Sequence, residues 1–303
     1  MGSSKTEWHE YIWKLRPNHL AAILAVMAAL PLFIPLGIPM EISYLTRDFY
    51  NSIEIKAAQA AAEGRRAVFA KGYLVYQVYP GRKDTAAAYI THMIKHNIQI
   101  LFVILDTTGH IDVEDLMTRY KFTYKLPKSD VIYGGPYVYG VDWVMTPFIA
   151  GEEPAMARIA SDVWDACQGR DFYGTSFNDL PMMQNIRSFR DVDLTQLDAY
   201  SGTHIEMFVR QWTSAAYPNI RAIATHAYED LAYAYGKYIF GTLSGLRCSA
   251  EYQTLVNFPG EQRAQIESRN TQAVVMFAAI ALGAIHLNIE KRRRAAPVRR
   301  EEA

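Results

Sequence analysis

The sequence predicts an α/β protein, in which an open, mostly parallel sheet of about five strands is covered by helices, plus two transmembrane helices. Three observations predict this class. Short runs of β-branched and apolar residues alternate with amphipathic stretches between residues 42 and 270. An apolar run without charge lies near each end of the chain, at 20–40 and 271–289. A stretch rich in lysine and arginine follows the second run directly.

The composition excludes several classes of protein. Half of the 303 residues are hydrophobic, so a disordered chain is excluded as the dominant state. The 31 Lys and Arg are balanced by 31 Asp and Glu, which removes the usual electrostatic argument for nucleic-acid binding, and we expect no nucleic-acid partner. Two cysteines are too few for a disulfide scaffold or a zinc module with several cysteines.

The N-terminal segment is expected to reach and then cross a membrane. Aromatic and aliphatic residues at helical spacing predict that residues 1–19 form a cytoplasmic segment lying in the membrane interface. Residues 20–40 contain no charge, and a helix of 21 residues is roughly 30 Å long, the thickness of the hydrocarbon core. Pro31, Pro35 and Pro39 predict an irregular outer half. A cleaved signal peptide is the alternative, but the run is long for one and contains three prolines.

Residues 41–270 are expected to form one extracytoplasmic α/β domain, because no repeat, linker or shift in composition divides them. A helix at 42–63 comes first and ends near Gly64. The predicted strands are 72–79, 98–106, 141–149, 191–199 and 219–227, and the predicted helices are 84–96, 112–120, 154–168, 203–215, 228–237 and 245–256. The tyrosine-rich stretch 120–140 reads as a loop or hairpin, either half-buried or in contact with a partner.

The second apolar run, 271–289, predicts the second transmembrane helix, and residues 290–303 form a basic tail. The tail carries six Lys and Arg, whereas the 18 residues before the run carry only Arg263 and Arg269. This bias places the C-terminus in the cytoplasm. Two spans then place the N-terminus there as well, so we expect a two-pass protein of the cell (inner) membrane with its central domain outside the cytoplasm.

Small residues recur at a spacing of four in both apolar runs. Such ridges let helix backbones approach closely, so the two helices are expected to pack on each other or on the helices of a partner. The positions are Ala21, Ala25 and Ala29 in the first run, and Ala279 and Gly283 in the second.

Strong catalytic motifs are absent. The chain has no P-loop, no dinucleotide-binding glycine pattern, no HExxH and no CxxC, and GTSFN at 174–178 lacks the final glycine of a nucleophile elbow. Ligands of open α/β sheets bind beyond the carboxyl ends of the strands. The polar residues expected there are Asp106, Glu152, Ser201 and His226, which we take as candidates for ligand binding. Ordinary helix capping is the competing interpretation of the same residues.

A pair of histidines and a pair of cysteines each allow two interpretations. His92 and His96 lie four apart on a predicted helix, as a metal site with two histidines would require, but no third ligand is evident. We therefore predict that they belong to a solvated face, and we expect neither a metal nor a cofactor. Cys167 and Cys248 either form one disulfide or are buried free thiols.

Three stretches carry a resemblance to a known family: IPLGIPMEIS at 34–43, DFYGTSFNDLPMM at 171–183 and FGTLSGLRCSAEYQTLV at 240–256. Together they resemble an uncharacterised prokaryotic family of two-pass membrane proteins, whose α/β domain lies between an N-terminal and a C-terminal transmembrane helix. The resemblance implies the same architecture from about residue 20 to 289. It implies no activity and no catalytic residues.

The leading functional hypothesis is a non-catalytic accessory or scaffold subunit of a larger membrane assembly. Its partners would be the lipid bilayer and either other membrane subunits or further copies of the chain. The alternative is a membrane-tethered enzyme or small-ligand-binding domain that uses the carboxyl edge of its sheet. A role in transport would need more helices than two.

Overall fold

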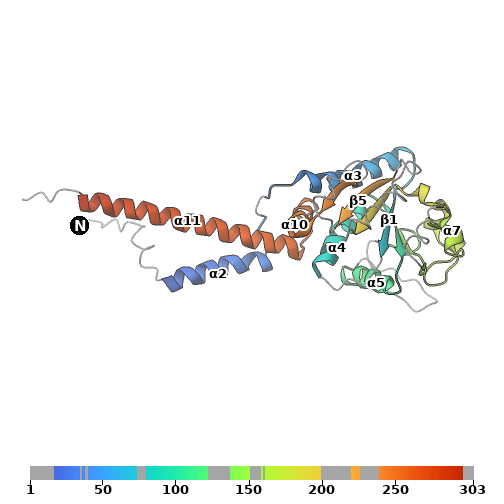
Figure 1. Ribbon diagram of the computed structural model, residues 1–303, viewed down its shortest axis with the longest axis horizontal. Coiled ribbons are helices and arrows are strands. Elements are labelled where there is room, and N and C mark those ends of the chain that lie inside the picture. Colours follow the sequence, from blue (N-terminus) through green and yellow to red (C-terminus); the bar gives the residue numbers. More distant parts are fainter. Residues whose placement is uncertain are drawn as a thin grey trace, which may run out of the picture. The chain divides into compact units, whose positions relative to one another are not determined.

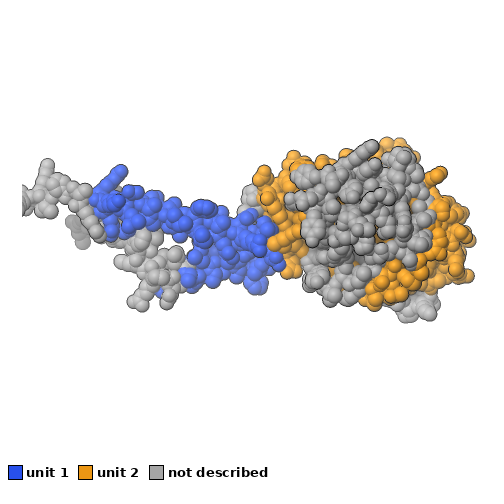
Figure 2. All heavy atoms as spheres, in the orientation of Figure 1, with its two compact units in different colours: residues 1–39, 263–303 blue, residues 40–262 orange. Residues whose placement is uncertain are grey.

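The computed structural model describes residues 17–34, 36, 37, 40–73, 80–121, 137–150, 158, 159, 161–198, 220–225 and 239–295 (Figure 1). Contacts divide the chain into two compact units (Figure 2). One unit comprises residues 40–262 and contains the sheet. The other comprises residues 1–39 and 263–303 and contains the two apolar runs.

A six-stranded sheet lies at the centre of residues 40–262, and every neighbouring pair of strands is parallel. Its spatial order is β3 (Trp143–Met145), β2 (Gln99–Ile104), β1 (Val68–Tyr73), β4 (Leu194–Asp198), β5 (Arg221–Thr225) and β6 (Ile239–Leu243). The prediction of an α/β fold with a parallel sheet is confirmed. The described part of the sheet has six strands, where about five were expected.

Helices and short 3₁₀ turns connect and cover these strands. Among the residues that the structure describes, the α-helices are α3 (Tyr44–Ala62), α4 (Pro80–Lys95), α5 (Gly109–Arg119), α7 (Val163–Ala166) and α10 (Gly245–Leu255). Three 3₁₀ turns, Phe177–Asp179, Pro181–Asn185 and Phe189–Asp191, precede β4. Ser176, the serine of the GTSFN stretch, caps the first turn by accepting a hydrogen bond from the backbone N–H of Asn178, which is a structural role.

The strand predictions succeed where apolar runs are unbroken. All six residues of β2 are buried, as expected for a strand covered on both faces, and β3, β4 and β5 also lie inside their predicted ranges. The first strand begins four residues earlier than predicted, because β1 occupies Val68–Tyr73, and residues 74–79 of the predicted range lie outside the described part of the chain. Lys71 and Gly72 interrupt its apolar pattern, although Lys71 is buried with its Nζ 6.0 Å from the centre of the Tyr89 ring. The strand β6 was missed altogether.

The ends of α3 follow from local chemistry. Ser43 precedes the helix, and its Oγ accepts a hydrogen bond from the backbone N–H of Thr46. Gly64, with φ +73°, follows its C-terminal end, which confirms the predicted helix at 42–63. Helices α4, α5 and α10 likewise match three predicted helices.

Several predicted elements lie wholly or partly outside the described residues. These are the helices at 203–215 and 228–237, residues 74–79 of the first predicted strand, and most of the tyrosine-rich stretch. Within the described part of that stretch, Tyr137 and Tyr139 are buried, so neither is available to a partner. Of the predicted helix 154–168, the structure describes 158, 159 and 161–168. Residues 158, 159 and 161 are helical, and a short helix, α7, follows at Val163–Ala166.

Both cysteines are buried free thiols, so the disulfide alternative is wrong. Burial, with a contribution from the charge of Asp162, raises the pKa of the Cys167 thiol to about 12. A thiol with so high a pKa is almost entirely protonated at neutral pH and therefore chemically inert.

Among its described residues, the unit formed by the two chain ends contains α2 (Pro17–Phe33) and nearly all of α11 (Glu261–Ala295). They lie side by side (Figure 1), and the hydroxyl of Ser268 on α11 donates to the carbonyl of Ala28 on α2 at 2.6 Å. The carboxylate of Glu267 accepts from the backbone N–H of Leu36, just beyond α2, at 2.8 Å. Since the end of α2 thus meets the beginning of α11, the helices run antiparallel.

The two helices differ in length. Within the described residues, one helix, Glu261–Arg292, is long and apolar enough to cross a membrane. The apolar helix near the N-terminus, Ala21–Phe33, is shorter. The α-helix containing it ends at Phe33, close to the prolines that were expected to disturb the outer half of the run.

Candidate functional site

The predicted ligand-binding residues are only partly described. Asp106 lies just beyond the carboxyl end of β2, as expected. The other three, Glu152, Ser201 and His226, lie outside the described residues.

Asp106 is engaged in local structure. Its Oδ1 accepts hydrogen bonds from the hydroxyl and the backbone N–H of Thr108, at 2.6 and 2.8 Å. These bonds hold the pKa of Asp106 below its usual range. The carboxylate thereby shapes the turn before α5, whereas Thr108, which caps the helix, makes no side-chain capping bond.

The order of the strands defines a switch point in the sheet. From β1 the chain proceeds to β2 and β3 on one side, whereas β4, β5 and β6 extend the sheet on the other side. In such doubly wound sheets, ligands bind beyond the carboxyl ends of the strands where the order reverses, here β1 and β4. The residues that follow these two strands, 74–79 and 199–219, lie outside the described part of the chain.

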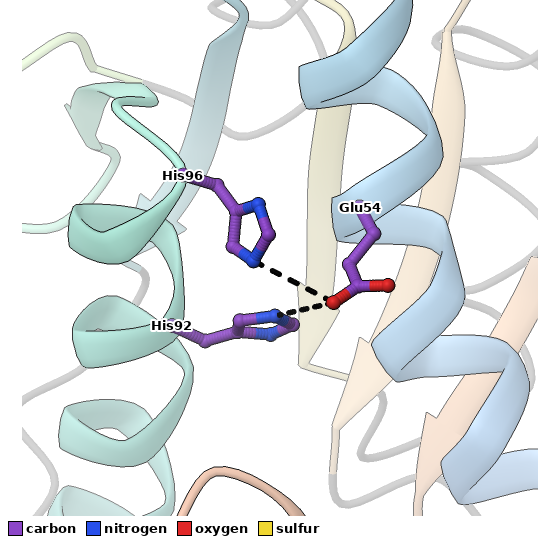
Figure 3. Close-up of side chains that lie close together, drawn as sticks. All are labelled: Glu54, His92 and His96. Atoms are coloured by element: carbon purple, nitrogen blue, oxygen red, sulfur yellow. Dashed lines mark ion pairs between the residues drawn. The ribbon is translucent and has the colours of Figure 1, made fainter.

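A second polar group, remote in sequence from these residues, is fully described. Glu54 on α3 faces His92 on α4 and His96 directly after the end of α4, where the two helices lie side by side with strands of the sheet behind them (Figure 3). The Oε1 atom of Glu54 lies 3.9 Å from Nε2 of His92 and 3.6 Å from Nε2 of His96. One ligand atom from each residue lies within 4.8 Å of the other two.

Helical geometry explains why the two histidines converge. Residues four apart on a helix lie on the same face, so both rings point from α4 toward α3. The two rings meet edge to face, with their centres 4.8 Å apart. Glu54 joins them because α3 packs beside α4, a contact that a pattern within α4 alone could not reveal.

His92 is held in one orientation by its neighbours. The ring stacks on that of Tyr50, with centres 4.3 Å apart and planes 20° apart. Its Nδ1 is 2.7 Å from the hydroxyl of Tyr252, a fully buried residue on α10. This bond can fix the tautomer in which Nδ1 carries the proton and Nε2 presents a lone pair toward Glu54.

Burial also sets the charge of His92. The side chain is 2% exposed, and this burial, together with the nearby His96 and Lys95, lowers the pKa of His92 to about 3. The ring is therefore neutral at pH 7, and its 3.9 Å approach to Glu54 is no ion pair under those conditions. The prediction of a solvated face is wrong for His92, because the histidine turns inward between α3 and α10.

The Nε2 atom of His92 is buried without a hydrogen-bond partner among the residues that the structure describes. Leaving a polar atom in this state costs about 1–3 kcal/mol. His96 and Glu54 are more accessible, with side chains 33% and 41% exposed. The group therefore combines one buried nitrogen of fixed orientation with two partly exposed side chains.

The small residues of the apolar runs differ in exposure. Ala21 and Ala25 are exposed, Ala29 and Ala279 are partly exposed, and no atom lies within 4 Å of the position that a Cβ on Gly283 would take. Among the described residues, Ser268 of α11 hydrogen-bonds to Ala28 of α2, and Glu267 hydrogen-bonds to Leu36 beyond the end of α2. Packing of the small residues against helices of a partner stays a prediction.

Comparison with protein-family models, with curated proteins and with solved structures finds no match to this chain.

Proposed function

We propose that the protein is a membrane-anchored accessory or scaffold subunit, in which two membrane-spanning helices hold an extracytoplasmic α/β domain. The observation that carries this proposal is the exposed apolar surface of α11. No residue in the apolar stretch of this helix is buried, and Phe277, Ile280 and Leu287 are 73%, 63% and 63% exposed. Such a continuous apolar surface is costly in water and is stable in a lipid bilayer.

The surroundings of this surface support a membrane span. Polar residues fill the first turns of α11, and Glu290, Lys291 and Arg292 follow the apolar stretch. Helix α2 offers a second exposed apolar surface, with Val26 and Phe33 65% and 82% exposed. Because α2 and α11 run antiparallel, two spans would return the chain to the side from which it came.

The topology can be tested with an epitope tag placed after Ala303. In right-side-out vesicles, added protease should digest the domain of residues 40–262 and spare the tag, because the basic tail favours the cytoplasmic side. The double variant Phe277→Lys/Ile280→Lys should expose the tag, since each lysine near the middle of a span costs about 2.5–3.5 kcal/mol on insertion scales.

The matched control is Phe277→Leu/Ile280→Leu, which keeps both positions apolar and should leave the tag protected. Digestion of the tag in wild-type right-side-out vesicles would contradict the proposed orientation. Release of the wild-type protein from membranes by alkaline carbonate would contradict the anchoring itself.

The accessory role predicts a stable assembly. After extraction in a mild detergent, light scattering coupled to size separation should give a protein mass well above the 34.4 kDa of one chain. The variant Ala21→Leu/Ala25→Leu should weaken this assembly about tenfold or more, because it fills the ridge that would let backbones approach closely. The control, Ile23→Leu/Val26→Leu, alters exposed positions of the same helix that are already large. A 34.4 kDa monomer in several mild detergents would refute the role.

One observation favours a second candidate, a small-ligand-binding domain: the strand order places a switch point between β1 and β4. A thermal-shift screen of the full chain with nucleotides, sugars, divalent metals and acyl compounds distinguishes the two functions. A stabilising nucleotide, sugar or acyl compound would support ligand binding at this edge, whereas no shift with any of them would remove its support.

A further inference from the structure

We propose that Glu54, His92 and His96 bind a divalent transition-metal ion, of which Zn²⁺ fits the donor set best. Two imidazole nitrogens and one carboxylate oxygen are common ligands of this ion. Two imidazoles disfavour Mg²⁺ and Ca²⁺, which take oxygen ligands. The proposal does not depend on whether the protein is anchored in a membrane, and it reverses the expectation of no metal drawn from the sequence.

The distances fit with small side-chain movements. Ligand atoms about 2.0–2.1 Å from a tetrahedral ion lie roughly 3.4 Å from one another. Glu54 Oε1 is 3.6 Å from His96 Nε2 and 3.9 Å from His92 Nε2, and no separation among the three ligand atoms exceeds 4.8 Å. Because the carboxylate and the ring of His96 are partly exposed, they can rotate by the amount needed, whereas His92 is already fixed.

The buried nitrogen of His92 is the observation that points to a ligand. Its side chain is 2% exposed, and Nε2 faces the other two ligand atoms without a hydrogen-bond partner among the described residues (Figure 3). A metal ion at this position would satisfy that atom. The same ion would compensate the carboxylate charge of Glu54, which in its absence faces two histidine rings.

The surroundings supply the outer contacts that metal ligands usually have. The hydroxyl of Tyr252 lies 2.7 Å from Nδ1 of His92, so it can accept a hydrogen bond from Nδ1–H, and in that tautomer Nε2 is free to coordinate. The side chain of Tyr50 hydrogen-bonds to Glu54 and also stacks on His92. Three helices, α3, α4 and α10, thus contribute to the site.

Three protein ligands leave one tetrahedral position for water or another ligand. The partial exposure of Glu54 and His96 gives solvent access to this position. The ion can therefore bind from solution and exchange, in contrast to a closed structural site with four protein ligands.

The test uses the full-length protein in detergent, stripped of metal with a chelator and dialysed against ZnCl₂. Wild-type protein should retain one Zn²⁺ per chain at micromolar or lower free metal, and Zn²⁺ should raise its melting temperature. His96→Ala should weaken binding about 100-fold or more while leaving the metal-free melting temperature nearly unchanged, because the side chain is partly exposed. His110→Ala is the control, since this histidine stacks on Phe172 and is not part of the group.

Tyr252→Phe examines the outer contact separately. It keeps the ring but removes the hydroxyl that orients His92, and it should weaken Zn²⁺ binding about 10- to 100-fold. The proposal fails if wild-type protein retains no Zn²⁺, or if His96→Ala binds it as tightly as the wild type. Titration with Co²⁺ gives an independent readout, because three protein ligands and water should produce the visible absorption of a tetrahedral ion, and that absorption should be missing in Glu54→Ala.

Discussion

Replacing Gly241 with alanine is expected to destabilise the α/β domain by at least about 3 kcal/mol, through overpacking and backbone strain together. Gly241 lies in β6 with φ +105°, a backbone conformation that residues other than glycine rarely adopt. A Cβ at this position would lie 2.1 Å from the backbone nitrogen of Phe49 and 2.5 Å from its Cα. These are backbone atoms of α3, so no rotation of a side chain can relieve the overlap.

The displaced helix would disturb much of the domain. Phe49 is fully buried, and its ring packs against the rings of Tyr89 and Tyr252. One turn further along α3, the hydroxyl of Ser52 donates to the carbonyl of Phe240 at 2.8 Å, so helix and strand are also joined by a hydrogen bond. Moving α3 away from β6 would open both contacts.

Gly245→Ala is the matched control for this prediction. Gly245 also has a positive φ, +61°, but nothing lies within 4 Å of the position of its Cβ. Alanine there should cost only about 1–2 kcal/mol of backbone strain. Thermal unfolding of both full-length variants in detergent, followed by circular dichroism, measures the difference. Equal losses for the two variants would show that contact between α3 and β6 contributes nothing beyond the backbone conformation.

Gly241 also illustrates why the sequence revealed part of the sheet and missed the rest. Buried parallel strands are recognised by unbroken apolar runs, and β2 has one. In β6 the glycine that permits the close approach of α3 also weakens the strand pattern, and in β1 Lys71 has the same effect. Both exceptions arise from tertiary packing, which local periodicity does not report.

The proposed metal site shows that the prediction of a site from sequence has the same limit. The spacing of His92 and His96 predicted that both rings share a face, and they do. Glu54, the third ligand of the proposed site, lies on another helix, precedes His92 by 38 positions and has no distinguishing local pattern. The burial of His92 depends on Tyr252, still further away in the chain. Sequence spacing can reveal ligands on one element, whereas convergence between elements has to be seen in the fold.

The carboxylate of Glu251 stabilises the beginning of α3 from a distance of about two hundred residues in the chain. Glu251 lies on α10 and is completely buried. Its Oε2 accepts hydrogen bonds from the backbone N–H and the hydroxyl of Ser43, at 2.9 and 2.6 Å, and from the hydroxyl of Thr46 at 2.8 Å. A negative charge at this position is also favoured by the helix dipole.

Glu251→Ala is therefore expected to cost about 3–5 kcal/mol, the usual loss when one partner of a buried charged network is removed. For a domain of this size, the melting temperature should fall by roughly 6–20 °C, as measured by circular dichroism on the full-length protein. Two interactions of Glu251 contribute to this loss, its capping of α3 and its ion pair with Arg247. Arg247→Ala removes only the ion pair, in which Arg247 donates to Oε1 of Glu251 at 2.8 Å while its own side chain is 65% exposed. An exposed ion-pair partner of this kind should contribute less than about 1 kcal/mol to the free energy of unfolding. If Arg247→Ala were as damaging as Glu251→Ala, the ion pair and not the capping of α3 would be the source of the stabilisation.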